Sequence, residues 1–103
     1  MADPMRIRAA VVGDSTEVKV LMNHEMETGQ RKDAQGKVIP AWFIQNVSAT
    51  HNGKNVLTAQ WGPAISKNPF LSFKFKGGAK GDKVQITWVD NRGEKRTDEA
   101  TIA

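Results

Sequence analysis

The sequence predicts an all-β fold, an immunoglobulin-like antiparallel β-sandwich of about seven strands. Apolar and polar residues alternate in short runs, as at residues 71–76 and 84–88, so that an extended chain sends one set of side chains to a core and the other to water. Turn-forming residues separate these runs at short intervals. No stretch carries the apolar spacing of an amphipathic helix. A small closed barrel is the alternative architecture.

The strands are expected, in chain order, at residues 6–12, 17–24, 41–51, 55–61, 70–76, 83–89 and 95–102. Asn52-Gly53 supplies the positive φ values of a tight hairpin turn between the third and the fourth. Residues 77–82 and 90–93 contain the turn formers that separate the last three strands. The alternation predicts a core that includes Val20, Leu57, Trp61, Phe73, Ile86 and Trp88.

Length and composition exclude several classes of protein. With 103 residues, the chain is expected to form a single domain over residues 1–103. Cysteine is absent, which excludes disulfides, thiolate metal sites and a thiol nucleophile. No apolar stretch approaches the ~20 residues of a membrane span, so no membrane association is expected. Residues 1–6 have no apolar core of a secretory signal peptide.

The chain is moderately basic, with 15 Lys and Arg against 11 Asp and Glu, a net charge of +4. In its densest basic stretch, residues 74–83, the lysines alternate with Phe73 and Phe75. On a strand these aromatic rings and the lysines lie on opposite faces, unlike a platform for single-stranded nucleic acid. The sequence therefore predicts a soluble basic surface and no nucleic-acid partner.

Neither catalysis nor a cofactor is expected. A nucleophile–base pair would need Ser or Thr beside His24 or His51, and no glycine-rich phosphate loop or serine-hydrolase elbow is present. One metal site is an alternative hypothesis. On a continuous strand Met22, His24 and Met26 would share a face, and thioether and imidazole ligands suit Cu(I). In the simpler interpretation Met22 belongs to the core and the strand ends before the other two.

Two long connections are the candidate binding segments, since loops on a rigid sandwich commonly carry function. In residues 62–69 two prolines restrict the backbone before binding. The candidate contacts there are Trp61, Gly62, Pro63, Ile65, Asn68, Pro69 and Phe70. In the alternative, Ile65 and Phe70 merely close one end of the sandwich. The polar connection after the second strand adds the candidates His24, Met26, Arg31 and Lys32, of which the two cations would steer an anionic partner or belong to a solvated hairpin.

These connections carry a family resemblance. The stretches at residues 24–33, 36–40 and 61–73, together with Ile86-Thr87-Trp88 and Asp98-Glu99, closely resemble the SoxZ family over essentially the whole chain. The resemblance implies an immunoglobulin-like β-sandwich without a cofactor. It also implies a non-catalytic scaffold that forms a heterodimer with SoxY, which carries the intermediates of thiosulfate oxidation on a cysteine.

What the resemblance implies about location and further partners is also specific. SoxZ proteins are thought to reach the periplasm bound to SoxY, so a periplasmic location is expected despite the absent signal peptide. Higher assembly and transient docking to other Sox enzymes are expected as well. A stand-alone periplasmic module that binds copper or an anionic ligand is the alternative function.

Overall fold

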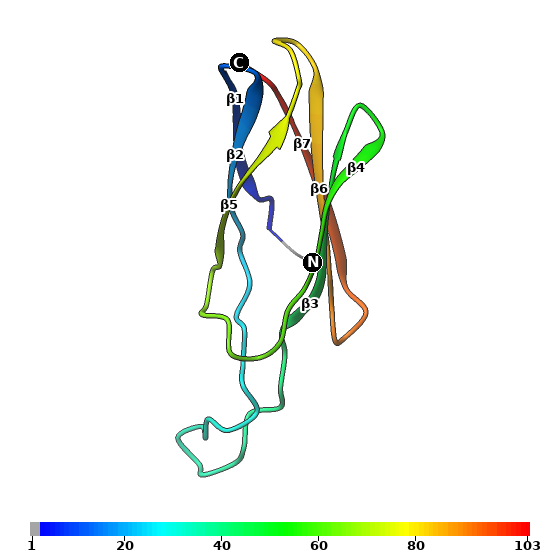
Figure 1. Ribbon diagram of the computed structural model, residues 1–103. Helices are drawn as coiled ribbons and strands as arrows, with labels where there is room; N and C mark the ends of the chain where they lie inside the picture. Colours follow the sequence, from blue (N-terminus) through cyan, green and yellow to red (C-terminus); the bar gives the residue numbers. More distant parts are fainter. Residues whose placement is uncertain (1–2) are drawn as a thin grey trace.

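The computed structural model describes residues 3–103, so Met1 and Ala2 at the start considered above lie outside the described residues. Seven strands form two antiparallel sheets that pack face to face (Figure 1). One sheet has the order β1-β2-β5 and the other β4-β3-β6-β7. The strands are β1 (Arg6–Val12), β2 (Ser15–Leu21), β3 (Ile44–His51), β4 (Lys54–Gln60), β5 (Phe70–Lys76), β6 (Lys83–Asp90) and β7 (Lys95–Thr101).

This architecture confirms the predicted all-β sandwich, and the predicted bounds are wrong mainly at two strands. The second strand ends at Leu21 instead of residue 24. Its neighbour β5 begins at Phe70, and the preceding Pro69 accepts a hydrogen bond from the Met22 amide at 2.9 Å. Since proline has no N–H to donate in return, the ladder ends there. The third strand begins at Ile44, three residues later than expected, beside a register shift in its pairing with β6.

The predicted hairpin turn between β3 and β4 is confirmed. Asn52 and Gly53 both have positive φ values, 50° and 86°. A two-residue turn of this kind matches the right-handed twist of the paired strands. Asn52 also holds the next element, because its side-chain oxygen accepts a hydrogen bond from the Lys83 amide at 2.9 Å.

The core lies between the two sheets, and backbone hydrogen bonds join the sheets along one side of the sandwich. Ala103 donates to Ala9 at 2.8 Å and accepts from Val11 at 3.1 Å, so the chain end after β7 pairs with β1. No backbone hydrogen bond joins the other two edge strands, β4 and β5, within residues 3–103. The largest fully buried apolar side chains are Trp88, Met22, Ile44, Ile86, Ile102, Val18, Val20, Val47 and Val84.

This asymmetry decides which predicted core residues are buried. Val20, Ile86 and Trp88 are fully buried, as predicted. The predicted burial of three others, Leu57, Trp61 and Phe73, is only half attained. Leu57 and Phe73 lie on the edge strands β4 and β5, and Trp61 directly follows β4. Side chains at the edge of a sandwich are covered less completely than those of the central strands.

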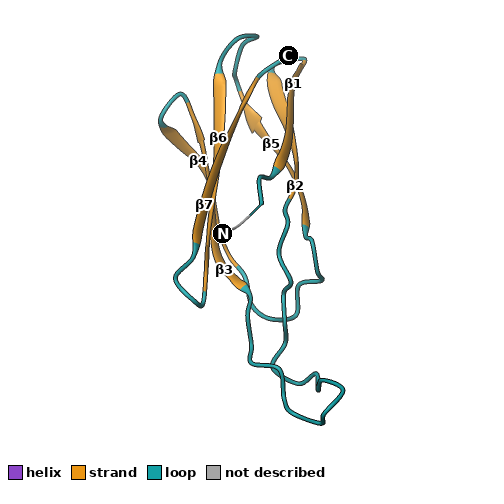
Figure 2. Cartoon of the chain, turned by 180° about the vertical axis from the view of Figure 1, so that it is seen from behind, coloured by secondary structure: helices purple, strands orange, loops and turns teal. Residues whose placement is uncertain are grey.

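The connection from β2 to β3, residues 22–43, leaves the sandwich as an extended arm (Figures 1 and 2). Its two branches pair where Glu27 and Trp42 exchange backbone hydrogen bonds of 2.6 and 3.0 Å. A second bridge pairs Lys32 with Val38 near the tip. The 22–43 arm is therefore a narrow ladder with backbone support of its own. Within residues 3–103 no helix could cross a bilayer.

Asp98 ties the start of β1 to the opposite sheet. Its carboxylate accepts hydrogen bonds from the Met5 amide at 2.9 Å and from the Arg96 guanidinium at 2.9 and 2.7 Å. The Arg96 hydrogen bonds lower the pKa of Asp98 below its usual value of 3.8, against the opposing effect of partial burial and with the help of the Met5 amide. The folded state thus favours the ionised carboxylate.

This pKa gives the protein a specific acid sensitivity. A carboxyl group with a lowered pKa in the folded state stabilises the fold above its unfolded pKa, and the contribution is lost as pH falls through the folded value. We expect the difference in melting temperature between wild type and Asp98→Asn to be constant above about pH 5 and to shrink below pH 3.8. Calorimetry at a series of pH values measures it. A difference that stays constant to pH 2 contradicts the assignment.

Candidate functional site

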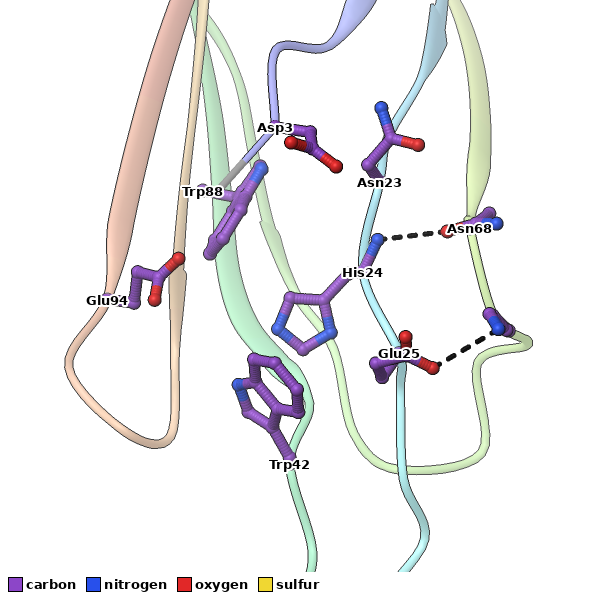
Figure 3. A pocket seen from close by; sticks show the side chains of 9 residues that line it. Asp3, Asn23, His24, Glu25, Trp42, Asn68, Trp88 and Glu94 are labelled. Atoms are coloured by element: carbon purple, nitrogen blue, oxygen red, sulfur yellow. Dashed lines mark hydrogen bonds and ion pairs between the residues drawn. The ribbon is translucent and has the colours of Figure 1, made fainter. Parts of the chain in front are cut away.

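The structure brings the two predicted binding segments together at one end of the sandwich. His24 at the base of the arm donates its amide to the Asn68 side-chain oxygen at 3.1 Å, and the Asn68 amide donates to the His24 carbonyl at 2.9 Å (Figure 3). Beside them, Lys67 pairs with Glu25 at 3.2 Å. The 61–70 loop and the arm are therefore one continuous surface.

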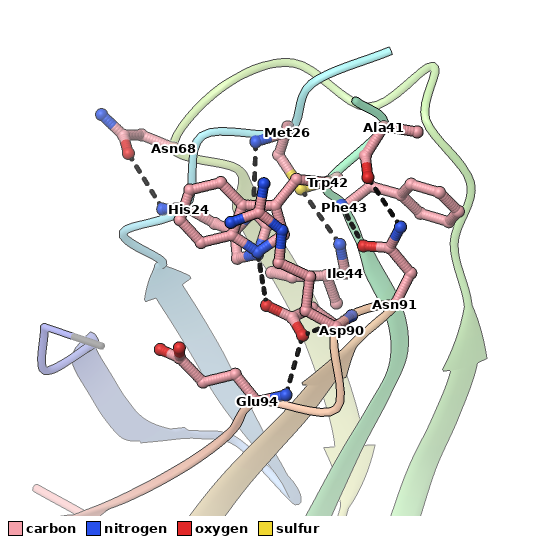
Figure 4. A network of polar contacts seen from close by, with 11 residues as sticks. His24, Met26, Ala41, Trp42, Phe43, Ile44, Asn68, Asp90, Asn91 and Glu94 are labelled. Atoms are coloured by element: carbon pink, nitrogen blue, oxygen red, sulfur yellow. Dashed lines mark hydrogen bonds and ion pairs between the residues drawn. The ribbon is translucent and has the colours of Figure 1, made fainter. Parts of the chain in front are cut away.

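His24 lies buried beneath this junction. The Met26 amide donates to His24 Nδ1 at 3.1 Å, so that nitrogen is an acceptor (Figure 4). Nε2 consequently carries the proton and donates to Asp90 Oδ2 at 3.1 Å. The ring packs edge-to-face on Trp88 and tilted on Trp42, at centroid distances of 5.2 and 5.0 Å. His24 is thus a neutral, fully hydrogen-bonded packing residue.

Asp90 is the centre of the network. Besides His24, Trp42 Nε1 donates to its Oδ2 at 2.7 Å, and the amides of Arg92 and Glu94 donate to its Oδ1 at 3.0 and 2.9 Å. Burial opposes ionisation of this carboxyl, but the four donors prevail and its pKa lies below the usual 3.8. The carboxylate therefore joins the arm, β6 and the β6–β7 turn in a single buried cluster.

Sequence reasoning missed Asp90 because it was interpreted only as part of the turn at residues 90–93. An Asp at the first position of such a turn commonly accepts amides two and four residues ahead, which here it does with Oδ1. The reach of Oδ2 to the arm depends on residues 48 and 66 positions away and left no local signal.

The donors of the copper hypothesis are engaged elsewhere. Both nitrogens of His24 are hydrogen-bonded, and Met26 is buried, with its sulfur 3.3 Å from the Ile44 amide nitrogen. Met22 is fully buried in the core. No group of three or more His, Cys, Asp or Glu side chains within residues 3–103 is arranged to hold a metal ion. The geometry therefore favours the structural interpretation of these three residues.

The sequence left open whether the 61–70 loop closes the end of the sandwich or offers exposed contacts, and the structure shows both. Ile65 and Trp61 pack, half-buried, against the core, so this part closes the end of the sandwich. Phe70, in contrast, is 62% exposed, while Pro69 beside it is buried. These residues line a shallow hollow of about 440 Å³ together with Ser66, Lys67 and Asn68. Gly62 and Pro63 lie in the turn that precedes Ile65, whose amide donates to the Gly62 carbonyl at 3.4 Å.

Arg31 and Lys32 lie on the arm and are exposed. Arg31 pairs with Glu27 through Nε at 3.0 Å and through Nη2. The hydrogen bond from Arg31 lowers the pKa of Glu27 below its usual value, against the opposing effect of desolvation. Arg31 lines a surface hollow together with Glu25 and with Lys67 of the 61–70 loop. The structure therefore places Arg31 close to that loop, whereas Lys32 pairs with Val38 near the tip of the arm.

A polar pocket of about 360 Å³ opens beside the His24–Asn68 junction (Figure 3). Trp88 is one of the residues that line this pocket, and its buried Nε1 has no hydrogen-bond partner within residues 3–103. Neither His24 nor His51 is hydrogen-bonded to a Ser or Thr hydroxyl in this part of the chain, and His51 instead contacts Asp82 at 2.7 Å.

Comparison with solved structures finds proteins of similar fold. A hypothetical protein from Pyrococcus horikoshii OT3 is similar with a TM-score of 0.65 and 17% identity, covering 99% of this chain and 89% of that chain. A superoxide reductase in the oxidised state gives a TM-score of 0.63 and 16% identity, with coverages of 99% and 89%. The superoxide reductase (neelaredoxin) from Ignicoccus hospitalis gives 0.61 and 14%, with coverages of 98% and 80%. At these identities the likeness concerns the fold alone.

Comparison with protein families is more specific. A search of curated proteins finds no matching relative. The family described as sulphur oxidation protein SoxZ matches residues 5–101, nearly the whole chain and all seven strands. The match includes the 22–43 arm, the 61–70 loop and the turn that begins at Asp90. The chain therefore belongs to the SoxZ family of sulfur-oxidation proteins.

Proposed function

We propose that this protein is the non-catalytic subunit that pairs with the cysteine-bearing SoxY and so helps to present covalently bound sulfur intermediates to the Sox enzymes. Membership of the SoxZ family carries the proposal. The chain has no cysteine, so a thiol that holds the sulfur must belong to the partner. We place the heterodimer in the periplasm, to which this subunit would travel bound to SoxY.

The 61–70 loop is our proposed contact with SoxY. Pro63 and Pro69 restrict its backbone, which lowers the entropy lost on binding. The hydrogen bonds between Asn68 and His24 anchor it to the arm, and the network beneath holds that junction to Asp90. Phe70 is an exposed aromatic side chain beside this supported loop, and aromatic anchors dominate the energies of many interfaces.

Thermal unfolding tests the pairing. SoxY that binds only the folded chain stabilises it by about 2.7 kcal/mol at a concentration 100 times the Kd, so a saturating excess should raise the melting temperature by several degrees. Phe70→Asp and Ile65→Asp are expected to weaken the binding of SoxY about tenfold or more. Isothermal titration calorimetry measures the affinity.

The matched control is Val38→Asp, which introduces the same charge in place of another exposed apolar residue, 55% exposed at the tip of the arm. It should bind SoxY as wild type does. Phe70 is exposed and Ile65 half-buried, so Phe70→Asp preserves the fold even if Ile65→Asp loosens the free chain. An unchanged melting temperature of wild type with SoxY refutes the pairing. Equal affinities of all three variants refute the loop assignment.

A further inference from the structure

The outer face of the β1-β2-β5 sheet carries a concentration of positive charge. The alternation of the strands points Arg6 and Arg8 of β1, Lys19 of β2, and Lys74 and Lys76 of β5 to the same side, away from the core. The register sets Arg8 and Lys19 directly opposite each other. We call this surface, with its five cations, the basic face.

The basic face accounts for the whole net charge of the protein. Its five cations are accompanied by one acidic residue, Glu17, so the face has a formal charge of +4, equal to that of the entire chain. The remaining ten basic and ten acidic residues cancel. The five cations come from three separate segments of the sequence and are gathered by the fold on one sheet.

Internal pairing neutralises little of this charge. Glu17 lies 3.4 Å from Lys19 and 3.9 Å from Lys74, and these are exposed contacts of small energetic value. Within residues 3–103 no carboxylate lies within 4 Å of Arg6, Arg8 or Lys76. These three cations are therefore available to an external anion.

The face also has relief and an apolar border. A hollow of about 450 Å³ along β1 is lined by Arg8 and Lys19 of this face and extends to Ala103 at the chain end after β7. At one end, Leu21 and Phe70 are cross-strand partners, 40% and 62% exposed. Because Phe70 also ends the 61–70 loop, the basic face adjoins the proposed contact with SoxY.

We propose that the basic face is the docking surface for an acidic patch on an enzyme that acts on the sulfur carried by SoxY. This inference rests on the proposed function. An enzyme that reaches this sulfur must approach the neighbourhood of SoxY, and the basic face lies beside that contact. A surface of exposed charges suits transient encounter, since charged residues are depleted in the cores of permanent interfaces and mainly raise association rates.

The geometry of the basic face disfavours two other polyanions, single-stranded nucleic acid and an anionic lipid membrane. Phe73 and Phe75 of β5 point inward, so the face offers no row of aromatic rings on which bases could stack. Its three strands lack the apolar helix face that inserts into a lipid headgroup layer. An acidic protein surface needs neither stacking rings nor an inserted apolar face, so the exposed charges are sufficient to bind it.

The test compares two triple variants of equal net charge in complex with SoxY. Arg8→Glu, Lys74→Glu and Lys76→Glu reverse the basic face, whereas Lys54→Glu, Lys80→Glu and Lys95→Glu reverse three exposed lysines elsewhere. Stopped-flow association with the Sox hydrolase that acts on carrier-bound thiosulfonate is measured at about 0.01 and 0.15 M salt. We expect the face variant to associate about tenfold more slowly at low salt and to lose most of the salt dependence, and the control to change less than about twofold.

The outcomes separate this inference from the proposed function. If wild type fails to bind SoxY, the proposed function fails. If the face variant alone fails to bind SoxY, the face is the permanent interface and the docking proposal is overturned. Equal slowing in both variants shows an effect of net charge only and also overturns it. Face-dependent binding to phosphatidylglycerol vesicles or single-stranded DNA, with unchanged enzyme association, assigns the face to another polyanion.

Discussion

Replacing Asp90 with alanine is expected to destabilise the protein by about 3–6 kcal/mol, because His24 and Trp42 would each lose a charge-assisted hydrogen bond worth ~1.5–3 kcal/mol while remaining buried or partly buried. The amides of Arg92 and Glu94 would also lose their acceptor, although water reaches these turn residues more easily. For a domain with a typical free energy of unfolding of ~5–15 kcal/mol this is a large fraction.

Urea unfolding followed by circular dichroism measures this loss. Asp14→Ala is the control, since Asp14 is an exposed turn aspartate whose carboxylate, within residues 3–103, accepts a single side-chain hydrogen bond, from the Ser15 hydroxyl at 3.4 Å. We expect it to change the free energy of unfolding by less than about 0.5 kcal/mol. A loss in Asp90→Ala as small as that of the control would show that the network does not hold the arm to the sandwich.

Trp88→Ala is expected to cost about 3–5 kcal/mol, the usual range for removing a buried tryptophan side chain. The indole is 1% exposed and is the largest fully buried side chain between the sheets. It also packs edge-to-face against His24, so its loss opens a cavity beside the network. The same unfolding experiment measures the effect.

Two comparisons make this prediction specific. Trp61→Ala should cost less, because Trp61 is only half-buried beside the edge strand β4. Trp88→Phe should also cost less than Trp88→Ala, because phenylalanine keeps much of the apolar volume and removes an indole N–H that has no acceptor within residues 3–103. Equal losses for all three variants would contradict the burial described here.

The sequence was sufficient for the fold because its information is local. Each strand needs only the period-two alternation of its own residues, and each tight turn needs only residues such as Asn52 and Gly53 that tolerate positive φ. The residues of the 61–70 loop and the arm were likewise identified as candidates from their own composition. The sequence did not predict how far each core residue is buried, because Leu57 and Phe73 show the same alternation as Val20.

By itself, then, the sequence determined the all-β sandwich, the inward-facing side of its strands at Val20, Ile86 and Trp88, and the SoxZ family. Only the tertiary structure decided that His24 bonds to Asp90, that Asn68 joins the loop to the arm, and that five scattered cations share one sheet face. These contacts join residues 44 to 66 positions apart or lie across three strands. Alternation specifies which side of a strand a residue occupies, whereas the pairing of strands specifies its neighbours, and that pairing is set by the packing of the whole chain.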